Sequence, residues 1–322
     1  MSALLALRYG LTPFHLIRVN PSLPFGGTSI ASKFSILERF RGRKEFLDQA
    51  LAPSHLSVSK RHEIAEQFIA RCSLPIIAKP DRGVVGIGVR KISTLHELGN
   101  LLRRMPADYL LQEYCEYPGE YGVFYCKHPG QGRGEVISLT QKLIPTVVGD
   151  GITTVRQLIQ NDQRYRNNGP ALLKHAQSLH VVPKRGEVFQ VIVQGSHTYG
   201  SIFLDRGNWI TPALNNQMNE LCSVDKDFCF GRFDLKTADF ESLCKGDVKI
   251  CELNGSMSEP IHIYDDRHTL LFGLKEFFRF YSHAYKIAKS NRNPISIVPY
   301  RRIMREYKIY LREKELVKQI MG

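Results

Sequence analysis

The sequence predicts a mixed α/β protein built from two α/β subdomains. Two observations lead to this fold class: short apolar strands alternate with helical patterns from Arg61 onward, and 322 residues are enough for about two domains. In addition, GRFDLK at 231–236 and CELNGSMSEP at 251–260 are typical of two short strands with polar ends. We describe the chain in four parts: an N-terminal extension or connector (1–60), a small subdomain (61–115), a large subdomain (116–290) and a basic C-terminal helix (291–322).

The N-terminal extension is predicted to contain a turn-rich connector and a basic helix. NPSLPFGG at 20–27 has two prolines and paired glycines, which is typical of turns. SKFSILERFRGRKEF at 32–46 predicts a basic helix. No nucleotide-binding motif is apparent before residue 60.

The small subdomain is expected to combine a few strands with two helices. A helix near 61–71 precedes the apolar strand LPIIAKP at 74–80. The glycine-rich turn DRGVVGIG at 81–88 then leads to a second strand and to a helix that begins after Thr94. DYLLQEY at 108–114 predicts one more strand.

The large subdomain is expected to hold most of the strands. Its predicted elements are two strands, a helix, a group of strands and a helix, at 120–126, 135–143, 153–160, 187–211 and 212–222. The two polar-ended strands follow, and a helix rich in Phe and Tyr at 276–289 closes the subdomain.

Charge and cysteine content narrow the class of protein. Lys and Arg outnumber Asp and Glu by 44 to 31, and this surplus favours a polyanionic ligand such as a nucleotide, a nucleic acid or an anionic membrane surface, without choosing among them. The seven cysteines form no C-x-x-C pair, so reduced thiols are expected. Because Arg8 interrupts the apolar start of the chain, we expect no export signal and a cytoplasmic protein.

The two polar-ended strands carry the strongest chemical signal. Arg232 and Asp234 lie on the first, and Glu252 and Asn254 lie on the second, so three oxygen ligands and one guanidinium can converge. Oxygen ligands of this kind suit Mg²⁺, which in such sites is usually shared with substrate phosphates. The alternative interpretation is that the acids are ordinary surface carboxylates at strand ends.

Lys79 stands at the end of an apolar strand, directly before the glycine-rich turn. From there it can reach a phosphate, while Gly83, Gly86 and Gly88 let backbone N–H groups approach phosphate oxygens. The turn lacks the P-loop pattern, which disfavours a Walker-type NTPase. A plain hairpin is the alternative for this segment.

The segment LLQEYCEYPGE at 110–120 carries an apolar strand into a polar linker. Tyr114 and Cys115 can offer main-chain groups to an adenine, and Glu120 can bind ribose hydroxyls, seven residues after Glu113. A solvated loop with incidental acids explains the same pattern about equally well.

Taken in order, these segments resemble the ATP-grasp superfamily over about residues 61–290. The resemblance rests on Lys79 to Gly88, Gln112 to Glu120, G-R-F-D and E-x-N. The D-alanine–D-alanine ligase branch has the same spacing of its two glutamates, and VVGDGITTVRQLI at 147–159 is similar to a segment of cyanophycin synthetase and bifunctional glutathione synthetase.

The resemblance implies a role for each matching residue. Lys79 and Lys142 would hold phosphates, and Glu120 would hold the ribose. The ATP-binding linker would comprise Gln112, Glu113, Tyr114 and Cys115, with adenine at Glu113 and the residues after it. Mg²⁺ or Mn²⁺ would be bound by Asp234, Glu252 and Asn254. Arg232 would neutralise charge that develops on an acyl phosphate and on the tetrahedral intermediate.

Two departures from the family pattern affect these assignments. The glycine-rich turn has no Ser or Thr between Lys79 and Gly88, so its phosphate contacts would come from backbone amides. The insertion TADFESLCKGD at 237–247 is longer than the hairpin in D-alanine–D-alanine ligases, which leaves the ligase branch in doubt. Lys127 is an alternative to Lys142 as the second phosphate lysine.

These assignments predict an ATP-dependent ligase that joins a small-molecule carboxylate to an amine, with an amino-acid or peptide-like substrate. The alternatives are a small-molecule kinase and a nucleotide- or polyanion-binding module without turnover. His197, His262 and Tyr264 are candidates for the acceptor pocket, although a lone histidine is more often structural. No specific nucleic acid is expected, and a homodimer is compatible with the sequence.

The C-terminal tail predicts a basic amphipathic helix. Residues 292–322 hold eight Lys or Arg against three Glu. Such a helix can lie on an anionic membrane, but a helix packed on the body with a solvated cationic face is the favoured interpretation.

Overall fold

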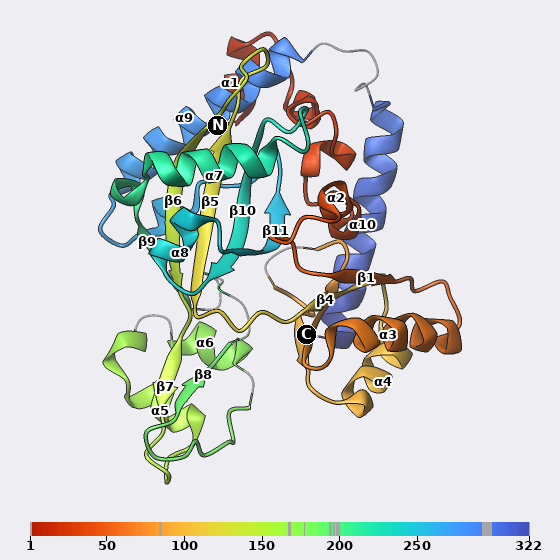
Figure 1. Cartoon of the computed structure of the whole chain (residues 1–322), viewed down its shortest axis with the longest axis vertical. Helices are drawn as coiled ribbons and strands as arrows, with labels where there is room; N and C mark the ends of the chain where they lie inside the picture. Colours follow the sequence, from red (N-terminus) through yellow and green to blue (C-terminus); the bar gives the residue numbers. More distant parts are fainter. Residues whose placement is uncertain are drawn as a thin grey trace.

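The computed structural model has the mixed α/β architecture that the sequence predicts (Figure 1). It describes residues 2–83, 86–166, 169–176, 178–192, 195, 197, 200–291 and 298–321. The two valines of the glycine-rich turn, parts of the predicted 187–211 strand region and the start of the predicted tail at 292–297 lie outside the described residues. Antiparallel sheets of four, five and two strands organise the rest.

The four-stranded sheet forms the small subdomain. Its order is β1 (Gln49–Ala52), β4 (Tyr109–Glu113), β2 (Ile76–Pro80) and β3 (Arg90–Ile92). Two helices, α3 (Val58–Cys72) and α4 (Leu95–Arg104), share a core with the sheet, in which Phe68, Leu102 and Tyr109 are fully buried. The expected boundary at residue 61 is wrong. The whole of β1, which lies before residue 61, pairs with β4 of the small sheet, and α3 begins at Val58.

The five-stranded sheet carries the large subdomain. Its order is β11 (Lys249–Asn254), β10 (Phe230–Thr237), β5 (Gly119–Cys126), β6 (Glu135–Leu143) and β9 (Ile202–Asp205). The insertion predicted after β10 contains α8 (Phe240–Lys245). One face, with Val123, Phe233 and Leu235, packs in a core with α7 (Pro212–Cys222) and α8. The opposite face, with Phe124 and Phe230, packs against α9 (Leu270–Ser290) and α1 (Ser2–Arg8). Side chains along a strand alternate between the two faces, so the residues next to Phe233 and Leu235 belong to the α9 side.

A third unit projects from the large sheet (green in Figure 1). It comprises the two-stranded sheet of β7 (Thr146–Val148) and β8 (Val188–Gln190) with α5 (Val155–Asn161), the short turn η4 (Gln163–Tyr165) and α6 (Gly169–His175). Its own small core is separate from that of the large sheet. Residues 146–192 are therefore a distinct unit within the predicted 116–290 subdomain.

The N-terminal extension is bound to the end of the large sheet. It comprises η1 (Pro13–Arg18), η2 (Pro24–Gly27), α2 (Lys33–Leu37) and η3 (Glu38–Phe40). The buried Asn20 side chain accepts hydrogen bonds from the backbone N–H groups of Cys229 and Phe230 at the start of β10, both at 2.9 Å. The basic helix predicted over 32–46 ends at Phe40, because Phe40 turns into the core and Gly42 follows with a φ of +86°. This segment is a structural part of the large subdomain, not a connector.

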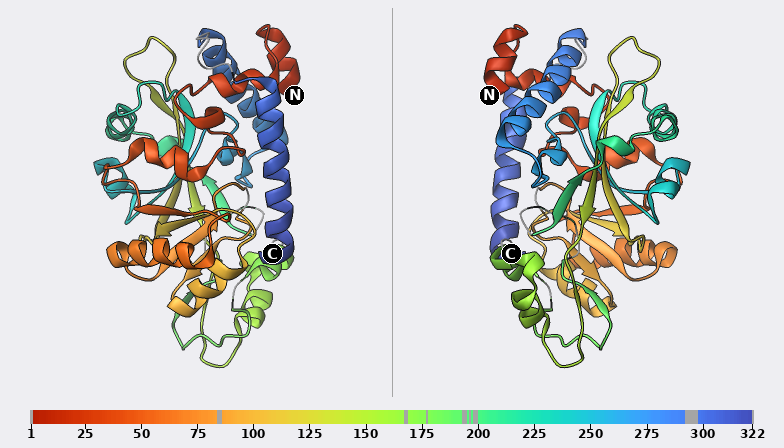
Figure 2. Two further views of the ribbon diagram at one scale, coloured as in Figure 1. Left: turned by 90° about the vertical axis from the view of Figure 1, so that its right-hand side faces the viewer. Right: turned by 90° about the vertical axis from the view of Figure 1, so that its left-hand side faces the viewer.

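The C-terminal helix α10 (Tyr300–Met321) runs along one side of the molecule (Figure 2). Its buried residues Ile303 and Tyr310 pack with Ile30, and Arg82 after β2 forms an ion pair with Glu306 at 2.8 Å. Two short 3₁₀ helices, η6 (Gly207–Trp209) and η7 (Ile261–Tyr264), complete the secondary structure of the described residues. Among the helices in the described ranges, none has the length and hydrophobicity needed to cross a membrane.

Candidate active site

The four polar residues of the two predicted strands converge as expected. In the antiparallel register of β10 and β11, Arg232 lies opposite Asn254 and Asp234 lies opposite Glu252. Arg232 and Asp234 are two positions apart, so both side chains leave the same face of β10. On the other side of β10, Gly122 of β5 lies opposite Asp234, and a Cβ atom there would stand 3.2 Å from the Arg232 side chain. Glycine at this position makes room for the guanidinium.

Asp234 is the centre of a buried network. Its Oδ1 atom accepts from Arg232 Nε at 2.8 Å and lies 3.1 Å from Lys142 Nζ. Its Oδ2 atom accepts from Arg232 Nη2 at 3.1 Å and from Asn254 Nδ2 at 3.0 Å. Burial opposes ionisation of Asp234, but Arg232 and Lys142 outweigh it and lower the pKa of the carboxyl to about 2. The group is therefore a carboxylate at neutral pH.

Lys142 is the second lysine of the site. It is buried between two carboxylates, 3.2 Å from Glu120 Oε1 and 3.1 Å from Asp234 Oδ1. Burial acts to lower the pKa of Lys142, but Asp234 and Glu120 reverse this and leave it raised. Lys127 lies at the far end of β5, where its Nζ donates to the backbone carbonyl of Lys226 at 2.8 Å. The structure thus brings Lys142, and not Lys127, to Asp234.

Lys79 is also buried, and its ammonium group donates two hydrogen bonds. Its Nζ atom donates to Gln112 Oε1 and to the backbone carbonyl of Cys251, both at 2.9 Å. Burial lowers the pKa of Lys79, with Glu252 opposing part of the effect. Gln112 therefore contributes by orienting Lys79, since it does not line the cavity described next.

A cavity of about 650 Å³ brings these groups together. Three lysines, the arginine, three acids and the asparagine face it: Lys33, Lys79, Lys142, Arg232, Asp234, Glu252, Glu259 and Asn254. Gly83 and Gly86 from the glycine-rich turn also line it. Gly88 does not, because its position is set by packing: a Cβ atom there would lie 2.7 Å from Val317 of α10 and 2.9 Å from the Tyr109 hydroxyl.

Lys33 is a site residue that the sequence did not reveal. It is the first residue of α2, and its Nζ donates to the carbonyl of Gly83 at 2.7 Å and lies 3.8 Å from Glu252 Oε1. The same helix start is joined to the glycine-rich turn by Asp81, whose carboxylate accepts from the Phe34 N–H at 2.9 Å. A lysine at a helix N-terminus has no motif of its own, so only the tertiary structure identifies it.

The predicted adenine linker borders a second cavity of about 510 Å³. Tyr114, Glu120, Lys142 and Lys236 line it, and the Tyr114 ring lies under Lys91 Nζ at 4.0 Å from its centroid. The backbone carbonyl of Cys115 accepts from Lys236 Nζ at 3.3 Å.

Glu113 is placed differently from the other linker residues. Its carboxylate accepts from the N–H of Asp48, at 3.2 Å, and its own N–H donates to the Asp48 carbonyl. This carboxylate therefore binds the segment before β1, and Glu113 lines neither cavity.

Two of the three candidates for the acceptor pocket reach the large cavity. His197 stacks on Tyr264 with ring centroids 4.9 Å apart, and the Tyr264 hydroxyl donates to Glu259 at 2.8 Å. Arg232 Nη1 donates to the Glu259 backbone carbonyl at 2.9 Å, which places this aromatic wall next to the arginine. His262 is instead buried between Ser138 and Glu276 and has the structural role that a lone histidine usually has.

The donor set fits a hard divalent cation. Asp234 and Glu252 supply carboxylate oxygens to the cavity, and Asn254, which donates its amide N–H to Asp234, has its amide oxygen to offer as a ligand. Oxygen-only sets of this kind suit Mg²⁺ or Mn²⁺ together with substrate phosphates. The buried lysines beside them match the negative charge of such phosphates.

Solved structures that align with this chain do so at low sequence identity and with TM-scores below 0.5. The chain aligns with a D-alanine–D-alanine ligase from Bacillus anthracis at 11% identity and a TM-score of 0.43, covering 90% of this chain and 70% of that one. The ATP-grasp ligase PsnB in complex with a minimal precursor aligns at 12% sequence identity and a TM-score of 0.44, covering 88% of this chain and 65% of that one. A bifunctional glutathione synthetase from Pasteurella multocida aligns at 14% sequence identity and a TM-score of 0.37, covering 76% of this chain and only 35% of the synthetase.

The sequence comparisons add no identification. No family profile and no curated protein matches the sequence.

Proposed function

We propose that this protein is an ATP-dependent ligase that joins a carboxylate to an amine through an acyl phosphate, on an amino-acid or peptide-like substrate. The observation that carries the proposal is the buried group of Lys142, Arg232, Asp234 and Asn254 at the wall of the large cavity. Burying charged groups costs free energy, and a β-sheet does not need two cations and a carboxylate in contact in order to fold. Such a group is typical of a functional site.

The two cavities together suit a nucleotide. Both are lined by Lys142, so a molecule with its base beside Tyr114 and its ribose beside Glu120 would have its phosphates at Lys142. Lys79 and Lys33 approach the same space from the small subdomain and the N-terminal extension. A bound Mg²⁺ would be held by Asp234, Glu252 and Asn254 and would neutralise phosphate charge.

The chemistry needs positioned charge and no side-chain nucleophile. A substrate carboxylate oxygen attacks the γ-phosphorus, the bond to the leaving ADP oxygen breaks, and an acyl phosphate forms. The amine nitrogen then attacks the acyl carbon, phosphate leaves, and the nitrogen loses a proton. Arg232 donates to the Glu259 backbone beside the aromatic wall of His197 and Tyr264, so it is suited to stabilise negative charge at the acyl carbon.

The test is an ADP-release screen over pooled amino acids, dipeptides and polyamines, with mass analysis of products. Release that requires both a carboxylate and an amine, with a product that has lost one water relative to the pair, is expected. A stable phosphorylated product that forms without an amine would replace the ligase with a kinase. Nucleotide binding with no product in any pool would favour a binding module without turnover.

The basic C-terminal helix supports only a secondary proposal, a peripheral contact with anionic membrane. Ile303, Tyr310 and Val317 of α10 face the body, whereas Arg301, Arg305 and other basic residues of the helix are exposed. This division matches a packed helix with a solvated cationic face. Vesicles that contain anionic lipid, compared with neutral vesicles in a flotation assay, test whether the face binds a membrane.

A further inference from the structure

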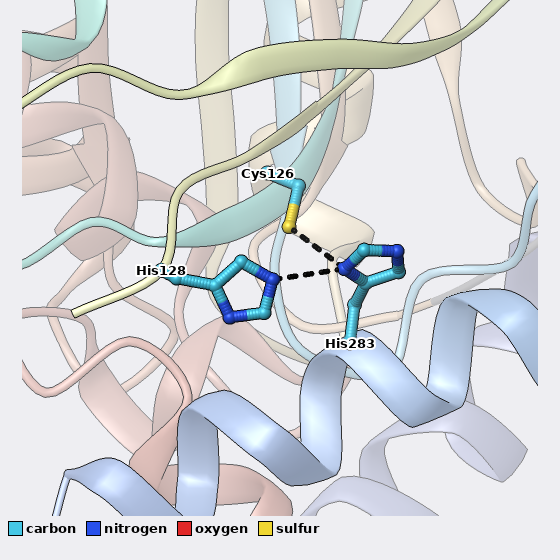
Figure 3. Close-up of side chains that lie close together, drawn as sticks. All are labelled: Cys126, His128 and His283. Atoms are coloured by element: carbon cyan, nitrogen blue, oxygen red, sulfur yellow. Dashed lines mark hydrogen bonds between the residues drawn. The ribbon is translucent and has the colours of Figure 1, made fainter. Parts of the chain in front are cut away.

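A second group of ligand-type side chains lies away from the candidate active site. Cys126 ends β5, His128 follows it, and His283 projects toward both from α9 (Figure 3). The Sγ atom of Cys126 is 3.7 Å from His283 Nδ1, and His128 Nε2 is 3.0 Å from the same Nδ1. The three ligand atoms all lie within 4.8 Å of one another.

This group is distinct from the proposed Mg²⁺ residues. Cys126 and Gly122 are on the same face of β5, and Gly122 lies opposite Asp234. Their separation of four positions corresponds to about 13 Å along the strand. Phe124 fills the interval and packs against Phe280 of α9, with ring centroids 4.7 Å apart. The proposed ligase chemistry therefore leaves Cys126, His128 and His283 unexplained.

The distances match those of a tetrahedral metal centre. With metal–nitrogen bonds of about 2.0–2.1 Å and a metal–sulfur bond of about 2.3 Å, tetrahedral angles place two nitrogens about 3.3 Å apart and nitrogen and sulfur about 3.6 Å apart. The observed separations from His283 Nδ1, 3.0 Å to nitrogen and 3.7 Å to sulfur, need only small side-chain adjustments to reach these values. Hydrogen bonds join His283 Nδ1 to both the thiol and the second imidazole, so the ligand types and their tetrahedral spacing are what point to a metal.

The charges around the group are mixed. Glu135 lies opposite Cys126 in the register of β5 and β6 and is the negative charge nearest the thiol. Arg279 and Lys286 from α9 are the positive charges that act on His283, and Arg279 is paired with Glu276 through its Nε, at 3.0 and 3.1 Å from the two oxygens.

We propose that Cys126, His128 and His283 bind a Zn²⁺ ion, with water in the fourth position. One thiolate and two imidazoles are soft and borderline ligands, which favour zinc over the Mg²⁺ that suits the oxygen set of the active site. The ion would connect the end of β5 to α9 and so hold the helix that covers this face of the large sheet. The thiol proton is released to solvent when the zinc–sulfur bond forms.

The test uses Co²⁺ as a spectroscopic probe on metal-free full-length protein. We expect one Co²⁺ per chain, with the visible bands of four-coordinate cobalt, a thiolate-to-cobalt charge-transfer band, and loss of both on addition of Zn²⁺. Cys126→Ser should abolish the charge-transfer band. His128→Gln should weaken Co²⁺ binding by roughly tenfold or more, since loss of even an outer-shell partner usually costs that much. His128 is half-exposed, so this variant is expected to fold.

Matched controls separate this site from other thiols and imidazoles. Cys244→Ser and His96→Gln change residues of the same types elsewhere and should bind Co²⁺ like the wild type. In thermal melts, ZnCl₂ should raise the Tm of the wild type and of both controls, but not of His128→Gln, while all four keep their response to MgATP. Absence of a charge-transfer band in the wild type, or an unchanged band in Cys126→Ser, would overturn the proposal.

Discussion

Replacing Asp234 with asparagine should destabilise the protein as well as stop turnover, because Asp234 accepts from donors on both of its oxygens. Arg232 Nε and Lys142 surround Oδ1, and Arg232 Nη2 and Asn254 surround Oδ2. An asparagine must turn its NH₂ group toward one of these donor pairs, so at least one hydrogen bond is lost and two buried cations lose a counter-charge. The pKa of Asp234, lowered from 3.8 to about 2, corresponds to about 2 kcal/mol of folding free energy.

Glu252→Gln is the matched comparison. Glu252 lines the same cavity, but its contact with Lys33 is long, at 3.8 Å, and it has no comparable set of donors among the interactions described. We expect both variants to lose ADP release in a saturating substrate mixture, but only Asp234→Asn to lose about 2 kcal/mol in urea unfolding. That loss corresponds to a Tm lower by several degrees, since 1 kcal/mol shifts the Tm of a domain of 150–250 residues by roughly 2–4 °C.

The pH dependence of folding stability should have a definite direction, which can be measured. A carboxyl whose folded pKa is depressed contributes stability above its unfolded pKa and loses it as pH falls toward the folded value. The stability difference between wild type and Asp234→Asn should therefore be constant above about pH 5 and should shrink below pH 4, the range set by the two pKa values of 3.8 and about 2. Equal stability of the two proteins at pH 7, or retained turnover in Asp234→Asn, would refute the role assigned to this network.

Four further predictions follow from the same geometry. MgATP should stabilise the protein by mass action, by about 2.7 kcal/mol of unfolding free energy at a hundredfold excess over the Kd, and so raise the Tm. A Tm that does not change with millimolar MgATP would contradict the nucleotide site. Arg232→Lys should lose the paired contacts to Asp234 and give far less hydroxamate than wild type when hydroxylamine replaces the amine, with a smaller change in nucleotide affinity; equal hydroxamate yields would exclude Arg232 from acyl transfer. Lys33→Ala should raise the KM for ATP more than it lowers kcat, because Lys33 joins the glycine-rich turn to Glu252; unchanged steady-state kinetics would remove Lys33 from the site. Gly88→Ala should lower stability by about 1–3 kcal/mol through overpacking against Val317, and a melt identical to wild type would show that α10 does not pack there as described.

Local sequence alone determined the elements that carry the chemistry. Arg232 and Asp234 are separated by one residue, as are Glu252 and Asn254, and this spacing places each pair on one face of any strand. The sequence also predicted α7 over 212–222 and, from its Phe- and Tyr-rich composition, most of α9; the N-caps of these helices are Thr211 and Thr269. These features depend on residues within one or two turns, so they can be read without knowledge of the partner segments.

The tertiary structure alone decided which distant groups share the cavity. Lys142 and Lys127 both belong to the β5–β6 hairpin, and only the register that pairs Glu120 with Lys142 brings Lys142 to Asp234. Lys33, the addition of β1 to the small sheet and the packing of α10 against Gly88 were likewise beyond the sequence. Each depends on which buried surfaces meet across more than a hundred residues or across sheet edges, and local propensity carries no information about that choice.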